Sequence, residues 1–92
     1  MKLTKVDIES NLKNFNGWLY DESRDAIVKD FKFKNFQEAM AFVLRVAFEA
    51  EKIDHHPDIL IEYNRVRLTL RTHSEDGVTK KDFDLVGRIE KI

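Results

Sequence analysis

The stretch "EKIDHHPDI", residues 51–59, places two adjacent histidines directly before the only proline of the chain. His55 and His56 are two of the three histidines in 92 residues, and the third, His73, lies in "LRTHSEDG". An imidazole ordinarily titrates with a pKa of about 6.5, so it suits proton transfer at neutral pH as well as metal binding. A chance grouping on a loop is the alternative to either function.

Acidic residues accompany these histidines at unusual positions. Glu51 lies one helical turn before His55, and a helical wheel places it inside the apolar arc of its helix, as Asp82 lies in the apolar stripe of a later helix. Burial of an unpaired carboxylate is costly, so inward acids are expected to have partners. A frayed helix end would instead expose Glu51, and a capping box would explain Asp82 without any chemistry. The candidate site contains Glu51, Asp54, His55, His56, His73 and Asp82.

The expected hairpin brings the three histidines together. Pro57 favours extended backbone at His56 and ends the preceding helix, so the histidine pair lies at the start of the next strand. His73 follows directly after the strand expected over 65–72. If this antiparallel hairpin turns at Asn64, residue 55 faces residue 73. We therefore predict three histidines at one end of one hairpin.

Three histidines could bind zinc, but the pattern favours proton transfer. Adjacent residues of an extended chain point to opposite sides, so His55 and His56 do not converge easily on one ion. No H-E-x-x-H helix is present, and with three glycines there is no glycine-rich phosphate loop. We expect no metal and no cofactor. Ser74 follows His73, and a nucleophilic role for it stays open.

Three helices are predicted to position these residues, each beginning with an N-cap oxygen and an acid three residues later. They run from Thr4 to about Asn14, from 36 to 52, and from 80 nearly to 92. The capping pairs are Thr4 with Asp7, Asn35 with Glu38, and Thr79 with Asp82.

Alternating segments over 26–33, 58–63 and 65–72 each combine one apolar face with one polar face, and 17–20 could add a fourth strand. This alternation is typical of an antiparallel sheet covered on one side. We predict one α+β domain over 1–92, with three helices packed on one face of a four-stranded antiparallel sheet.

The helix expected over 36–52 is more apolar than one sheet requires. Its apolar positions, from Phe42 and Ile53 round to Leu44, fill an arc of roughly 200°, about twice what a surface helix needs. Other helices of the domain or a second subunit must cover the excess. We favour a homo-oligomer.

Composition excludes several classes of protein. The chain is 42% hydrophobic and 36% charged with a net charge of −1, which argues against direct nucleic-acid binding. No cysteine is present, so disulfides and thiol chemistry are excluded. The N-terminal residues have no apolar signal region, and no stretch approaches a membrane span. We expect a cytoplasmic location, or a nuclear one as well in a eukaryote.

The spacing of the polar residues resembles the signature of the pterin-4a-carbinolamine dehydratases. The resemblance covers about Asn14 to the end, including "RDAIVKDFKFKNFQEAMAFVLRVAFEAEKIDHHP". The matching positions are Glu51, His55, His56, Pro57, Tyr63, His73 and Asp82. Arg71 departs from the family pattern, in which that position is often small and polar.

The resemblance implies dehydration of a 4a-hydroxytetrahydropterin, formed by aromatic amino acid hydroxylases, to quinonoid dihydropterin and water, as in tetrahydrobiopterin recycling. By position, His55 and His73 would be the acid/base pair, and His56 would hold or assist. The residues lining or orienting the pterin pocket would be Glu51, Asp54, Thr72 and Asp82.

Two further expectations follow from the resemblance. Family members form α+β subunits that dimerise and often form tetramers. Some relatives also act as a dimerisation cofactor for a homeodomain transcription factor, so a non-enzymatic coactivator role is the alternative function. A pterin-binding relative working in another pathway is a third possibility.

Overall fold

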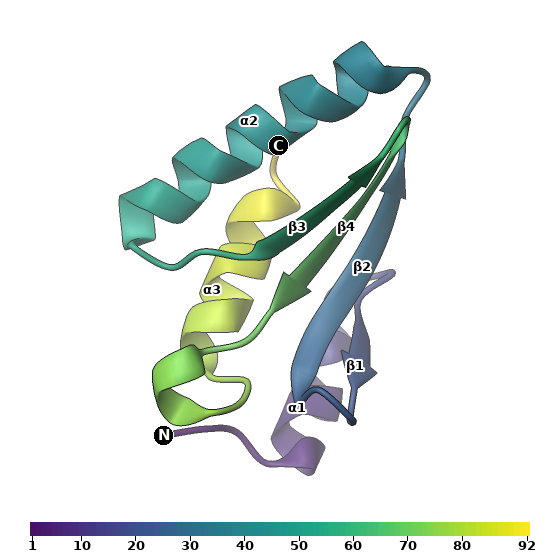
Figure 1. Ribbon diagram of the computed structural model, residues 1–92. Coiled ribbons are helices and arrows are strands. Elements are labelled where there is room, and N and C mark those ends of the chain that lie inside the picture. Colours follow the sequence, from purple (N-terminus) through teal and green to yellow (C-terminus); the bar gives the residue numbers. More distant parts are fainter.

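The computed structural model describes residues 1–92 and confirms the α+β class (Figure 1). Four antiparallel strands form one sheet in the order β1-β2-β4-β3. The elements are α1 (Lys5–Leu12), β1 (Leu19–Asp21), β2 (Ala26–Lys32), α2 (Phe36–Ile53), β3 (Asp58–Glu62), β4 (Arg65–Leu70), the 3₁₀ turn η1 (His73–Glu75) and α3 (Lys80–Ile89). None of the helices is both long and apolar enough to cross a membrane.

The predicted caps begin all three α-helices. The side chains of Thr4, Asn35 and Thr79 each accept a hydrogen bond from a backbone N–H of the first turn. Only α3 has the reciprocal capping box, in which the Asp82 side chain also accepts from the Thr79 N–H. This box fixes the start of α3, and with it the place of Asp82.

All three helices pack on one face of the sheet. The inward strand residues Ile27, Val66, Leu68 and Leu70 are almost fully buried, and they share one core with residues of every helix. The opposite face carries charged side chains, including the ion pair of Arg67 with Asp30 at 2.7 Å. The strand alternation therefore decides which face meets the helices.

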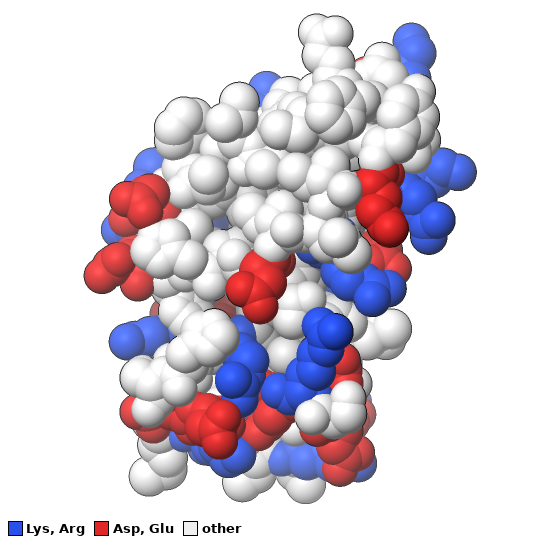
Figure 2. All heavy atoms as spheres, viewed as in Figure 1, with Lys and Arg blue, Asp and Glu red and all other residues white.

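Helix α2 buries only part of its apolar surface within the chain. Ala39, Val46 and Ala50 face the core. Phe36, Leu44 and Phe48, here called the α2 apolar stripe, remain 50%, 56% and 65% exposed. Figure 2 shows few charged side chains over the upper part of the molecule, where α2 lies in Figure 1. The other helices of the domain therefore leave this stripe uncovered.

Candidate active site

The end of α2 separates the two adjacent histidines. Asp54 adopts a left-handed conformation (φ 51°, ψ 46°), and its N–H bonds to the Ala50 and Glu51 carbonyls. This conformation costs a non-glycine residue about 1 kcal/mol, although Asp tolerates it better than most. After the turn, His55 is buried and His56 is exposed. The candidate residue Asp54 thus ends the helix, and its exposed side chain makes no hydrogen bond within the chain.

His55 forms a buried pair with Asp82. Its Nε2 lies 2.6 Å from Oδ1 of Asp82, and the residues are 9% and 0% exposed. An ionised carboxylate offers only acceptor oxygens, so the hydrogen of this bond belongs to Nε2. Nδ1 is then the nitrogen of a neutral His55 ring that can accept a proton.

The other oxygen of Asp82 is also satisfied. Oδ2 accepts from the Thr72 hydroxyl at 2.9 Å and from the Thr79 N–H at 2.8 Å. The two threonine hydroxyls lie 2.7 Å apart. Because Thr72 donates its single hydroxyl hydrogen to Asp82, Thr79 donates to Thr72. Asp82 therefore both caps α3 and orients His55. The capping box and the inward acid with a partner, which the sequence offered as alternatives for Asp82, are both present.

Thr79 is a member of this network that the candidate list lacked. It is 5% exposed, and its hydroxyl contacts the Thr72 hydroxyl. The signal in the sequence is its spacing, three residues before Asp82, which by itself predicts only a helix cap.

His56 forms an exposed pair with Glu51. Its Nε2 lies 2.6 Å from Oε1 of Glu51, with side chains 53% and 75% exposed. Of the two positions that the sequence left open for Glu51, the structure has the exposed one, although the helix does not fray there and continues to Ile53. The part of the apolar arc that contains Glu51 is the α2 apolar stripe, which faces solvent. Surface pairs contribute about 0–1 kcal/mol, so this contact adds little to stability.

The predicted hairpin register is wrong by one residue. Glu62 pairs with Arg65, so the turn is centred between Tyr63 and Asn64 rather than on Asn64. The paired strands end at Asp58 and Thr69, and extending this register would set residue 55 opposite 72 instead of 73. Thr72 is accordingly the residue that shares Asp82 with His55.

His73 follows Thr72 as the exposed first residue of η1. Its imidazole makes no hydrogen bond or ion pair within the chain. No group of three or more His, Cys, Asp and Glu side chains is arranged to hold a metal ion. The three histidines thus occupy different settings: His55 buried and paired, His56 exposed and paired, His73 exposed and free.

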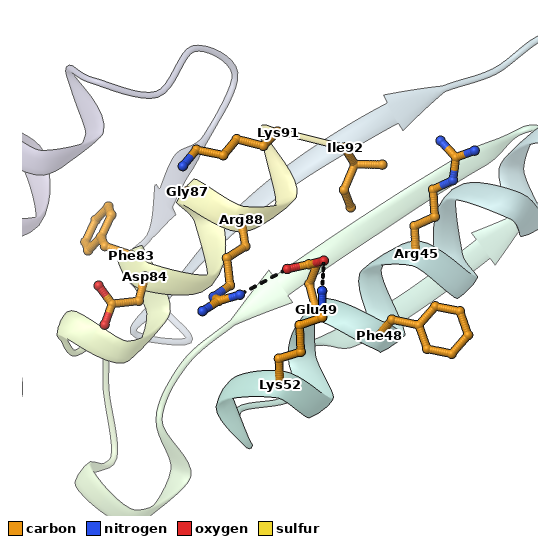
Figure 3. Close-up of a pocket in the computed structure, with 10 residues that line it drawn as sticks. All are labelled: Arg45, Phe48, Glu49, Lys52, Phe83, Asp84, Gly87, Arg88, Lys91 and Ile92. Carbon is orange, nitrogen blue, oxygen red and sulfur yellow. Dashed lines mark hydrogen bonds and ion pairs between the residues drawn. The ribbon is translucent and has the colours of Figure 1, made fainter.

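The largest surface groove, of about 880 Å³, lies between α2 and α3 and contains none of the histidines (Figure 3). Glu49 lies in this groove and pairs with Lys52 and Arg88 at 3.0 and 3.1 Å. These two cations hold the pKa of Glu49 below its usual range. The histidines lie outside this groove, His55 and His56 between α2 and β3 and His73 after β4.

Two named relatives match this chain over nearly its whole length. A Sulfolobus acidocaldarius protein named "Putative pterin-4-alpha-carbinolamine dehydratase" is 48% identical over 92 residues, which cover 100% of this chain and 99% of that protein. A Brucella ovis protein of the same name is 42% identical over 91 residues, covering 99% and 94%.

Solved structures have the same fold. The transcriptional coactivator/pterin dehydratase of Brucella melitensis superposes with a TM-score of 0.94 and 41% identity, covering 99% of this chain and 97% of that one. A pterin dehydratase-like RuBisCO assembly factor of the alpha-carboxysome shares the fold alone, with a TM-score of 0.70 and 19% identity over 84% and 89% of the chains. The sequence profile of pterin 4 alpha carbinolamine dehydratase matches residues 1–92. The chain belongs to the pterin-4-alpha-carbinolamine dehydratase family.

Proposed function

We propose that this protein is a 4a-hydroxytetrahydropterin dehydratase that works by histidine acid/base catalysis. The observation that carries the proposal is the buried pair of His55 with Asp82, in a chain whose family acts on pterins. A carboxylate that fixes the tautomer and orientation of an imidazole is a common arrangement for a proton-transfer group.

The reaction needs one acid and one base. The C4a–O bond breaks with its electron pair, and an acid protonates the departing hydroxyl so that it leaves as water. A base removes the N5 proton, and the N5–H electron pair forms the N5=C4a bond of the quinonoid dihydropterin. These two proton transfers require neither an oxidant nor a metal, so no cofactor is part of the proposal.

We assign the two proton transfers to His55 and His73. His55 has a fixed ring, and His73 has a ring free of internal partners, so each retains a nitrogen for the substrate. His56, supported by Glu51 at 2.6 Å, would hold the pterin at the rim, with Asp54 beside it. Thr72 and Asp82 are buried and would orient His55 rather than touch the substrate.

The substrate would come from a hydroxylase reaction. A 4a-hydroxytetrahydropterin forms when an aromatic amino acid hydroxylase uses a tetrahydropterin and oxygen, and dehydration begins recycling of the product. We propose the same place for this protein.

We propose further that the protein is a homo-oligomer, a dimer or a tetramer. The supporting observation is the α2 apolar stripe, whose three large side chains are half or more exposed in the single chain. Contiguous apolar surface of this kind usually marks a protein interface.

A transcriptional coactivator role is the second candidate. It is supported by the Brucella melitensis relative, which is named as a coactivator and a dehydratase. An α2 surface used for self-association would be the surface available to such a partner, so the two interactions would compete.

The deciding experiment follows breakdown of 4a-hydroxytetrahydropterin, generated by a hydroxylase, with and without the purified protein. We expect faster formation of the quinonoid product with the wild type, and loss of this acceleration when all three histidines are replaced by Ala. The Arg67→Gln variant is the matched control, because its ion pair with Asp30 lies on the open sheet face. Equal rates with and without the folded wild-type protein would contradict the enzymatic proposal.

A further inference from the structure

The backbone alone determines where His73 lies. The His73 side chain is exposed and makes no hydrogen bond or ion pair within the chain. A misplacement of about 1 Å can cost a reacting group up to 10²-fold in rate, so the turn that carries this ring must itself be held.

The turn is a closed loop with one unfavourable residue. The Thr72 N–H donates to the Gly77 carbonyl at 2.8 Å, and the Asp76 N–H donates to the His73 carbonyl at 3.1 Å. Asp76 has φ 56° and ψ 44°, the left-handed region, which costs a non-glycine residue about 1 kcal/mol. The Glu75 and Gly77 N–H groups also donate to the Thr72 carbonyl, at 3.1 and 3.4 Å, so four backbone hydrogen bonds close the turn, and side-chain contacts to Asp76 add to them.

Arg71 braces the turn from the strand side. Its Nη2 donates to Oδ1 of Asp76 at 2.7 Å, and this ion pair spans the turn from the residue before Thr72 to the residue before Gly77. Arg71 is well covered, with a side chain 22% exposed, while the Asp76 side chain is 90% exposed. Arg71 is thus the better covered member of the pair. Its guanidinium holds the pKa of the Asp76 carboxyl below its usual range.

A second brace comes from the turn between β1 and β2. Asp25 accepts from the Lys2 ammonium at 2.9 Å and from the Tyr20 hydroxyl at 2.8 Å, and Lys2 approaches the Asp76 carbonyl at 3.5 Å. A Cβ atom on Gly77 would lie 2.7 Å from Oδ2 of Asp25. Because Gly77 has no side chain, Asp25 and Lys2 can lie directly against the turn that carries His73.

We propose that Arg71 and Asp76 are positioning residues, whose ion pair holds the η1 turn so that His73 faces the same substrate as His55. The inference rests on the proposed dehydratase function. The Arg71–Asp76 ion pair lies beyond the end of β4, whereas the ion pair that β4 itself makes, Arg67 with Asp30, lies on the paired part of the strand.

The test compares Arg71→Gln and Asp76→Asn with the matched control Arg67→Gln. Asp76→Asn removes the charge but keeps a residue that tolerates the left-handed conformation. We expect both brace variants to lower kcat about tenfold or more with KM changed much less, whereas Arg67→Gln keeps the wild-type kcat. Arg71→Lys, which keeps a cation near Asp76, should recover part of the loss.

The decisive readout is a double-mutant cycle with His73→Ala. If Arg71 acts through His73, then Arg71→Gln should cause no further loss of kcat once the imidazole is absent. The same fold-loss in both backgrounds would overturn the inference, as would a kcat for Arg71→Gln and Asp76→Asn within twofold of the wild type. If the wild type is active and either of these results is found, the positioning role of Arg71 and Asp76 is overturned but the proposed function is not. If the wild type is inactive, the proposed function is overturned, and the positioning role with it.

Discussion

Asp82 lies 27 residues after His55 in the chain, yet its Oδ1 is 2.6 Å from the His55 Nε2 in the interior of the protein. The same carboxylate caps α3 and accepts from Thr72, so a helix start and an imidazole are positioned by one group. Removal of that group should therefore affect stability and activity together.

Asp82→Ala should lower the free energy of unfolding by about 2–4 kcal/mol, because it removes a cap and leaves buried donors without a partner. Asp82→Asn should fold but lower kcat by roughly 10²–10⁴-fold, since the amide no longer enforces a hydrogen on Nε2. Urea unfolding and the dehydratase assay measure the two effects. Asp84→Asn, an exposed change on the same helix, is the control. Normal activity in Asp82→Asn would remove the orienting role.

His55→Ala and His73→Ala should each lower kcat by roughly 10²–10⁴-fold, the usual contribution of one acid/base group. The double variant should be less active than either single variant, although losses from groups that act together need not multiply. His56→Ala should mainly raise KM, because its exposed ring is assigned to holding the pterin. Steady-state kinetics separate these effects. Near-wild-type kcat in folded His55→Ala and His73→Ala would disprove the assignment.

Tyr20 should titrate at unusually high pH. Burial, and then its hydrogen bond to Asp25, raise the pKa of Tyr20 from 10.0 to about 12. The folded protein therefore binds this proton more tightly than the unfolded chain, so the resulting stability is complete below pH 10.0 and is lost as pH rises through about 12.

The measurement is an ultraviolet titration of tyrosinate in the Tyr63→Phe variant, which leaves Tyr20 as the only tyrosine of the two in the chain. Asp25→Asn should lower the midpoint, because the neutral amide no longer favours the protonated phenol. A midpoint at 10.0 in the folded Tyr63→Phe protein would contradict the prediction.

Leu44→Glu and Phe48→Glu should weaken self-association, because each places a charge in the α2 apolar stripe. Sedimentation at roughly 50 micromolar should show the wild type as a dimer or tetramer and these variants as smaller species. Val6→Glu is a matched control, since Val6 is 77% exposed on α1, away from the stripe. A monomeric wild type at this concentration would exclude the proposed oligomer.

Chelation should leave the activity unchanged. The imidazoles of His55, His56 and His73 have different environments and form no metal-binding group with the acids. Dialysis against a chelator, followed by metal analysis and the dehydratase assay, tests this expectation. Loss of activity together with a stoichiometric metal, and its return on adding zinc, would favour the three-histidine zinc site instead.

The sequence by itself determined the local features. Side-chain oxygens at Thr4, Asn35 and Thr79 predicted every helix start, because a cap acts within its own first turn. The alternation in β2 and β4 predicted the covered face, because side chains alternate along any strand. The position of Asp82 in an apolar stripe likewise predicted its burial. Each of these predictions depends on neighbours within a few residues.

Only the tertiary structure decided which of the candidate residues meet. The hairpin is centred between Tyr63 and Asn64 rather than on Asn64, so extending its register sets His55 opposite Thr72 instead of His73. The sequence pattern is compatible with either turn. Likewise, the apolar arc of α2 does not show which part of it the sheet covers, so the sequence left the inward and exposed positions of Glu51 both open. Contacts such as Thr79 with Thr72, or Arg71 with Asp76, depend on where a turn places two side chains in space. Residue types and spacing do not contain that information, because register and packing are set by the whole fold.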